Sequence, residues 1–207
     1  MAELVDRIQE YATQAVEYVR RAVGLPLEYD SDTLPLLDHY LRSVPTEEPA
    51  AVKLVVMTAG AYFGEVVRRT IGGRWEYTDE AVEEWRVVMP AGLSFSPPGF
   101  VAAAIARAAL EDFDTELDAP PRMLPYVQAA LANMGAATEE EYYSLCGRLD
   151  TLEHVHEILV GAAASMLGDA GPPDGDGDAD ADPPDDEVVM EADPDVAGDD
   201  PGGGLVN

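Results

Sequence analysis

The stretch GAYFGEVVRRTIGGRWEY, residues 60–77, marks the point where the chain changes from a helical to a strand pattern. Upstream of it, a run that is apolar on nearly every side predicts a helix over about residues 49–71. A helix with this composition is expected to be buried at the centre of a domain. The pair Gly72–Gly73 ends the helix, and Trp75 opens a region with the two-residue alternation of β-strands. This junction predicts an α+β fold.

The alternation continues in three short runs, which carry large apolar residues at every second position. They are Trp75 and Tyr77, then Trp85, Val87 and Met89, then Leu93 and Phe95. Pro90–Ala91–Gly92 supplies a turn between the last two runs. The sequence therefore predicts a small three-stranded antiparallel meander against the central helix.

Helical periodicity and capping residues predict a mostly helical body around these elements. The expected helices cover about residues 3–23, 34–43, 97–110, 121–134 and 139–166. The last one opens with a capping box from Thr138 to Glu141. Its apolar seam, spaced alternately three and four apart, consists of Tyr142, Leu145, Leu149, Leu152, His156, Leu159, Ala163 and Met166. Such a seam packs either on the body's own core or, as a homodimer through the 139–166 helix, on a second copy.

The charge of the chain limits its partners. The sequence has 41 acids and 12 bases, and residues 169–207 hold 14 of the acids and no base. Residues 1–168 therefore hold the other 27 acids and all 12 bases, which gives them a net charge of −15. A field of this sign repels nucleic acid and anionic membrane surfaces. It favours a basic protein as partner.

Other features of composition point to a cytoplasmic protein. Cys146 is the single cysteine, which excludes an intrachain disulfide. The N-terminal residues carry acids where a signal peptide has its apolar core, and no apolar run is expected to approach the roughly 20 residues of a membrane span. Only one of the 12 bases is lysine, a bias suggestive of a GC-rich bacterial genome.

The segment after Gly168 differs in composition from the body. Asp, Gly, Pro and Ala dominate residues 169–207, which predicts a disordered acidic tail after a globular domain over residues 1–168. Four acids of the tail match positions of a calcium-loop template: Asp176, Asp178, Asp180 and Glu187. Because Ala181 replaces the glycine that this template requires, only weak, nonspecific cation binding is expected.

Glu65 is the polar residue that most needs an explanation, because it interrupts the apolar central helix. An isolated buried carboxylate is costly, so it must be paired, accept hydrogen bonds or take up a proton. Arg68 and Arg69 lie one helical turn away, and the indoles of Trp75 and Trp85 offer further donors. These five residues form the candidate polar cluster. A structural pair, a binding pocket and general acid–base catalysis all remain open for it, with the structural pair favoured.

No other set of residues predicts catalysis, a metal or a cofactor. Glu153 and His156 form one Glu-x-x-His fragment of a di-iron signature, whose second copy is missing, so His156 is expected to be a core residue. His39 has no nucleophile at a recognisable spacing, and Cys146 is expected to pack as a small hydrophobe. Phosphate-binding loops, dinucleotide fingerprints and zinc-type cysteine pairs do not occur in the sequence.

One part of the chain resembles a group of uncharacterised bacterial domains. Their pattern is a helix of the type Gly-Ala-Tyr-x-Gly-Glu-Val, then Gly-Gly-x-Trp, a strand, and a proline-containing turn into a helix. Here it falls on Gly60, Ala61, Tyr62, Gly64, Glu65, Val66, Gly72, Gly73, Trp75 and Pro97. The resemblance covers about residues 34–110 and implies a small α+β domain, without an activity.

The net negative charge and the absence of a recognisable set of catalytic residues in the sequence favour a noncatalytic protein-interaction domain. An immunity-like or regulatory factor that binds a basic partner would be such a domain. The alternative is a small-molecule-binding domain or enzyme whose pocket surrounds Glu65, Arg68, Arg69 and Trp75.

Overall fold

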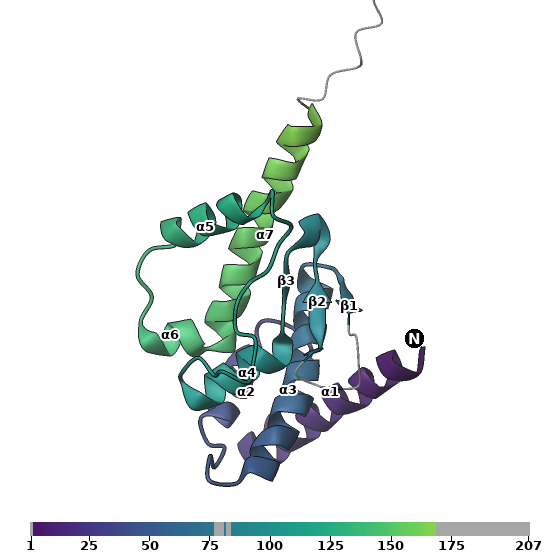
Figure 1. Cartoon of the computed structure of the whole chain (residues 1–207). Helices are drawn as coiled ribbons and strands as arrows, with labels where there is room; N and C mark the ends of the chain where they lie inside the picture. The colour runs from purple at the N-terminus through teal and green to yellow at the C-terminus, as the bar shows by residue number, and fades with distance from the viewer. Residues whose placement is uncertain (1, 77–80, 82–83, 169–207) are drawn as a thin grey trace, which may run out of the picture. The chain divides into compact units, whose positions relative to one another are not determined.

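A computed structural model describes residues 2–76, 81 and 84–168, and in this part of the chain it contains seven α-helices and one three-stranded antiparallel sheet (Figure 1). The fold class is therefore α+β, as predicted. In chain order the elements are α1 Ala2–Val23, α2 Leu34–Leu41, α3 Pro49–Thr70, β1 Arg74–Glu76, β2 Arg86–Val88, the 3-10 turn η2 Pro90–Gly92, β3 Ser94–Phe95, α4 Pro97–Ala106, α5 Leu124–Asn133, α6 Glu139–Tyr143 and α7 Leu145–Gly168.

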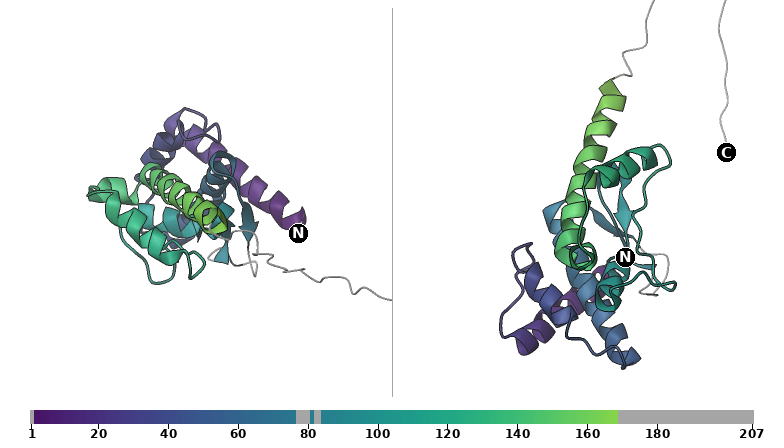
Figure 2. Two further views of the ribbon diagram at one scale, coloured as in Figure 1. Left: turned by 90° about the horizontal axis from the view of Figure 1, so that it is seen from above. Right: turned by 90° about the vertical axis from the view of Figure 1, so that its left-hand side faces the viewer.

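The central helix is α3, as the apolar run predicted. It packs against α1, which crosses it, and against α4 (Figures 1 and 2). From Val55 to Val67 every residue except Met57 is buried. The expectation that no apolar run reaches the length of a membrane span was wrong, because α3 is long and apolar enough by length and composition. Within the body, 67% of its most apolar window is buried against other parts of the protein.

The sheet is the predicted meander, with the strand order β1-β2-β3. Trp75 pairs with Val87 across β1 and β2, and Val87 pairs with Phe95 across β2 and β3. The Phe95 ring lies 5.9 Å from that of Phe63 on α3, in an edge-to-face contact. The sheet therefore adds its apolar face to the core built around α3. Tyr77, predicted for the first strand, lies outside the described residues.

Helix α4 ends earlier than predicted. The apolar pattern placed its end near Leu110, whereas the helix ends at Ala106 and Arg107 adopts a left-handed conformation with φ of 51°. Ala106, Ala108 and Ala109 are exposed, so continuing the helix would bury little further apolar surface. Helix α5 likewise starts at Leu124 rather than near Pro121, because a turn closed by Met123 N–H and the Pro120 carbonyl precedes it.

The predicted continuous helix over residues 139–166 was wrong in one respect, because it is broken at Ser144. The capping box between Thr138 and Glu141 is present, but it opens only the short helix α6. Ser144 has the extended ψ of 148°, and α7 starts after it. The Ser144 hydroxyl then accepts a hydrogen bond of 3.0 Å from Gly147 N–H. The break gives α7 an N-terminus of its own inside the body.

Helix α7 packs on the body's own elements, namely α2, α4, α5, α6 and the turn η2. Its buried stripe consists of Leu145, Leu149, Leu152, Val155 and Leu159. Two ends of the predicted seam do not belong to it, because Tyr142 is 53% exposed and Met166 is 39% exposed. Val155, rather than the partly buried His156, is the stripe residue of the middle turn. Figure 1 shows α7 continuing beyond α5 toward its C-terminal end.

The predictions for the acidic tail, residues 169–207, concern a segment outside the described residues. They include its disorder and the calcium-like positions Asp176, Asp178, Asp180 and Glu187.

Candidate functional site

Four of the five residues of the predicted polar cluster lie together. The Glu65 carboxylate accepts two hydrogen bonds of 2.9 Å from Arg68, one to each oxygen. Oε1 accepts a third, of 2.8 Å, from the indole Nε1 of Trp75. Arg69 Nε lies 3.7 Å from Oε2. Glu65 itself is only 5% exposed. The carboxylate is therefore saturated by protein donors and has little contact with solvent.

These donors keep Glu65 ionised. Burial raises the pKa of its carboxyl, but the hydrogen bonds from Arg68 and Trp75 and the charges of Arg68 and Arg69 outweigh burial, so the net pKa is lowered. The same hydrogen bond raises the pKa of Arg68. A general acid or base near neutral pH needs a carboxyl pKa shifted upward. The shift of Glu65 has the opposite direction and is typical of a structural ion pair.

Two glycines on the same helix explain how Trp75 reaches Glu65. A Cβ at Gly64 would collide with the six-membered ring of Trp75, and a Cβ at Gly60 would lie 2.9 Å from Cα of Pro98. Both glycines therefore allow a close approach to α3, by the indole in one case and by the first turn of α4 in the other. Gly64, Trp75 and Pro97, which belong to the pattern of the bacterial-domain resemblance, thus pack directly against one another.

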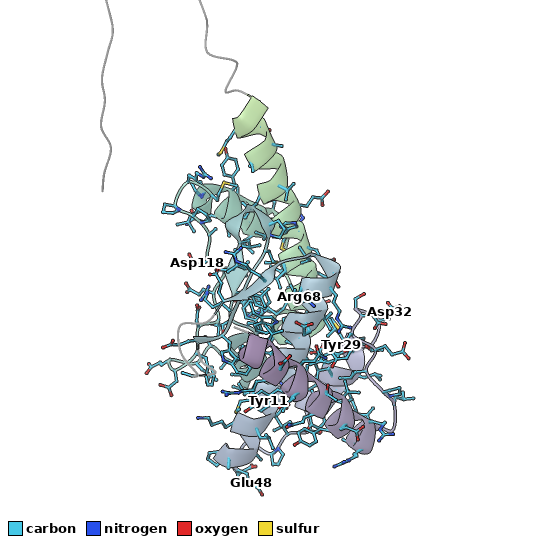
Figure 3. The ribbon with its side chains drawn as sticks, turned by 90° about the vertical axis from the view of Figure 1, so that its right-hand side faces the viewer. Tyr11, Tyr29, Asp32, Glu48, Arg68 and Asp118 are labelled. Atoms are coloured by element: carbon cyan, nitrogen blue, oxygen red, sulfur yellow. The ribbon has the colours of Figure 1, made fainter. Side chains whose placement is uncertain are left out.

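Trp85 does not join this hydrogen-bond cluster. Its ring packs edge-on against Trp75 with centroids 6.3 Å apart, and its buried Nε1 has no hydrogen-bond partner within the described residues. On the outer side, the guanidinium of Arg69 stacks 4.1 Å above the ring of Tyr29. Figure 3 shows Arg68 and Tyr29 on the same side of the molecule. Trp75 therefore covers the Glu65 carboxylate from the inner side, and Arg69, stacked on Tyr29, lies next to it at the surface.

The other predicted positions offer no chemical site. His39 is exposed, His156 is partly buried with a buried Nδ1 that has no partner in the described part of the chain, and Glu153 is exposed. Burial, followed by the nearby Asp38 carboxylate, raises the pKa of the Cys146 thiol to about 12, so it stays protonated at neutral pH. Within residues 2–76, 81 and 84–168 no group of three His, Cys, Asp or Glu side chains could hold a metal ion.

Sequence reasoning missed Asp38. Asp38 is 6% exposed, and its carboxylate accepts hydrogen bonds from Leu145 N–H at 2.7 Å and Cys146 N–H at 3.2 Å. It is thus a cap for α7 supplied by α2. No local pattern could reveal it, because capping motifs are recognised from residues within one turn of the helix that they cap.

A second missed feature is the acidic loop, residues 111–118, which joins α4 to α5. All five of its acids are exposed: Glu111, Asp112, Asp114, Glu116 and Asp118. Two apolar residues that alternate with these acids, Phe113 and Leu117, pack against the core. The acid density and the two apolar positions are visible in the sequence EDFDTELD and could have indicated an anchored acidic segment.

The acidic loop is held to the sheet by backbone hydrogen bonds. Asp118 N–H donates to the Ser94 carbonyl at 2.9 Å, and Ser94 N–H donates to the Asp118 carbonyl at 2.8 Å. Arg86 on β2 pairs with Asp114 and also donates to the Ser94 hydroxyl at 3.1 Å. Figure 3 labels Asp118 in this loop and Arg68 in the Glu65 cluster, which lie at separate places. The loop therefore presents carboxylates from a fixed backbone.

Comparisons with protein-family models, with characterised proteins and with solved structures found no match for this chain. The resemblance to uncharacterised bacterial domains stays a sequence-based expectation.

Proposed function

We propose that this chain is a noncatalytic protein-interaction domain of the bacterial cytoplasm that binds a basic partner, in the manner of an immunity-like or regulatory factor. The observation that carries the proposal is the anchored acidic loop. It holds five carboxylates and no base within eight residues, in a body whose net charge, with these five counted, is −15. Of these five acids, only Asp114 has an arginine partner among the described contacts.

Anchoring matters because a fixed array of charges costs less ordering on binding than a flexible one. The Ser94–Asp118 backbone pair and the packed side chains of Phe113 and Leu117 provide this anchoring. Complementary charge also speeds the encounter between two proteins and selects against partners of the same sign. These properties fit recognition of lysine- or arginine-rich surfaces.

The small-molecule or enzymatic alternative around Glu65 gains no comparable support. A ligand at that carboxylate would have to displace Trp75 or Arg68, both of which donate to it at 2.8–2.9 Å. The lowered pKa of Glu65 also argues against proton transfer near neutral pH. The geometry of this cluster fits a role in holding α3 to the sheet.

The test is affinity capture from the native host, with the wild-type protein and a variant that carries Glu111→Gln, Asp112→Asn and Glu116→Gln. These three acids accept no hydrogen bond and form no ion pair among the described contacts, so the fold should be retained, which circular dichroism can verify. We expect the variant to lose at least tenfold in affinity for a captured basic protein. Association with the wild type should slow as salt rises, because exposed charges are screened beyond roughly 8 Å at physiological ionic strength.

A matched control carries Glu10→Gln, Glu47→Gln and Glu157→Gln, three exposed acids on α1, before α3 and on α7. It changes the net charge by the same amount as the acidic-loop variant. Retained binding by this control would locate recognition at the acidic loop. Equal losses in both variants would mean that general charge, not this loop, recruits the partner. An acidic partner would exclude the proposal altogether.

A further inference from the structure

Residues 1–168 contain four runs of more than ten residues without a charged side chain: 54–64, 87–106, 123–138 and 158–168. The first two form core elements, within α3 and from β2 to α4, and are mostly buried. The last two lie at the surface. In the run 123–138, 13 of the 16 residues are exposed, as are six of the nine from Ile158 to Met166. An exposed stretch without charges is typical of a surface that another molecule covers.

The two exposed runs lie together. The first contains α5, which packs mainly on α7, and the second is the C-terminal end of α7 (Figures 1 and 2). Helix α5 has one buried stripe, formed by Met123, Val127 and Ala130. Outside it, the two helices carry large apolar residues that are each at least 36% exposed. These residues define the α5–α7 surface: Leu124, Tyr126, Leu131, Ile158, Val160 and Met166.

Charged residues return at the borders of both runs, and most of them are acids. Glu139 follows the first run, Glu157 precedes the second and Asp169 follows it, whereas Arg122 is the one base at these borders. An apolar centre with a charged rim is the usual anatomy of a protein–protein interface. The sign of the rim favours a basic occupant. A second copy of the chain would bring the same acids, so repulsion opposes its approach.

The acidic loop ends next to the α5–α7 surface. Four residues separate Asp118 from Met123. Among them Pro120 packs on the turn η2, since a Cβ at Gly92 would lie 2.8 Å from Cγ of Pro120. Helix α7 contacts the same turn. The end of the acidic loop is therefore held close to α7, just before α5 begins.

We propose that the α5–α7 surface binds an amphipathic helix of a basic partner. The apolar side of that helix lies on the surface, and its lysines or arginines face the surrounding acids. A third helix packs on a pair of helices by the same fit of ridges into grooves that joins the pair. An amphipathic helix supplies the apolar residues for this contact at positions i, i+3, i+4 and i+7. The inference rests on the basic partner proposed above and adds the structural element that is recognised.

The probe is a fluorescently labelled synthetic peptide of about 14 residues, a common helix length, with leucines on one helical face and lysines elsewhere. Fluorescence anisotropy measures its binding to the full-length protein at low salt. A peptide of the same composition in scrambled order is the control. We expect the scrambled peptide to bind at least tenfold more weakly, because it keeps the charge and loses only the apolar face.

Two variants of the protein locate the site. Leu124→Gln with Leu131→Gln removes exposed apolar side chains of α5, and Ile158→Gln with Met166→Gln removes those of α7. Because all four residues are exposed, the fold should be retained. Each variant should weaken binding of the amphipathic peptide at least fivefold.

The matched control is Leu25→Gln with Leu54→Gln. Both leucines are exposed, and they lie before α2 and on α3. This control loses the same amount of exposed apolar surface and should bind the peptide like the wild type. An equal loss of binding in the control and in the α5 and α7 variants would overturn the proposal.

The acidic-loop variant, measured with the same peptide, separates this inference from the proposed function. Weaker binding by the acidic-loop variant alone would overturn the helix site and leave recognition to the loop. Weaker binding by the α5 and α7 variants alone would support the helix site and remove the loop from recognition.

Two further results would overturn the proposal. Equal binding of both peptides to the wild type would mean that charge alone explains binding, and this comparison does not depend on whether the variants fold. A dimer at low salt in sedimentation equilibrium, dissociated by the α5 and α7 variants, would assign the surface to a second copy of the chain.

Discussion

Asp38 on α2 caps the backbone of Leu145 on α7, although 107 residues separate them along the chain. Its two oxygens accept from consecutive N–H groups, at 2.7 Å from Leu145 and 3.2 Å from Cys146. Free N–H groups at a helix start carry a partial positive charge, which a carboxylate stabilises. A single buried side chain thus connects α2 with the start of α7.

Replacing Asp38 should therefore destabilise the whole body. Asp38→Ala leaves two backbone donors buried without an acceptor and should lower the free energy of unfolding by about 1–3 kcal/mol. Asp38→Asn keeps one acceptor oxygen and should cost less. Urea denaturation followed by circular dichroism measures both. Asp32→Ala, at an exposed acid just before α2, is the control, and an equal loss in it would contradict the capping role.

Glu65 should prove to be a structural residue. Glu65→Ala removes the acceptor for Trp75 and Arg68 and should cost about 1–3 kcal/mol, whereas Glu65→Gln retains an oxygen for the indole and should cost less. Thermal unfolding of the two variants provides the comparison. If Glu65→Gln kept full stability but abolished binding or turnover of some ligand, the pocket interpretation would replace the structural one.

The pH dependence of stability follows from the lowered pKa of Glu65. A lowered carboxyl pKa stabilises the folded state above the unfolded-state value of 4.5, and this contribution is lost as pH falls through the folded-state pKa. We therefore expect the stability difference between wild type and Glu65→Gln to shrink as the pH is lowered below 4.5. Chemical denaturation at pH 7, 5, 4 and 3 tests this. A difference that is constant over the series would exclude the ionised carboxylate as its cause.

The tail should be dispensable for folding. Residues 169–207 contribute no apolar seam, so truncation after Gly168 should leave the melting temperature within about 2 °C of that of the full chain. In a domain of this size a loss of 1 kcal/mol lowers the melting temperature by about 2–4 °C. Differential scanning calorimetry of both proteins decides this. A drop of several degrees would mean that the domain boundary at residue 168 is misplaced.

A homodimer through the 139–166 helix stays a prediction, and the structure limits where its interface can lie. The stripe of α7 from Leu145 to Leu159 is buried in the body, whereas Ile158, Val160 and Met166 are exposed. No charged residue follows Glu157 in this helix. We expect sedimentation equilibrium to show association that strengthens with salt, as repulsion between acidic bodies is screened, and that Ile158→Glu with Met166→Glu abolishes. A monomer under all conditions would exclude this dimer.

The parts of the fold that could be predicted depend on local patterns. The apolar run of α3 indicated a central helix, and the spacing of Glu65, Arg68 and Arg69 follows from one helical turn. The glycine pair and the alternation after it located the sheet. The sequence offered two indoles, those of Trp75 and Trp85, as possible donors to Glu65. Trp75 is the one that reaches it, because the glycine at position 64 leaves room for its ring.

The parts that could not be predicted depend on contacts between distant segments. Ser144 is a residue type that often starts helices, and its hydroxyl accepts from Gly147 N–H, but the apolar spacing continues across it and hides the break. The second cap of α7 comes from Asp38 on another helix, which no local pattern shows. The guanidinium of Arg148 on α7 stacks on rings from two other helices, Phe100 on α4 and Tyr142 on α6. Such arrangements follow from tertiary packing and not from helical periodicity.

The acidic loop also has a consequence for self-association through β-strands. In the described sheet β3 is an edge strand, and an open edge is a template on which other chains can add strands and aggregate. The backbone pair between Ser94 and Asp118 occupies part of this edge, and the flanking carboxylates repel another copy. Removing the loop backbone would therefore favour fibrillar aggregation, whereas neutralising its acids leaves the edge covered.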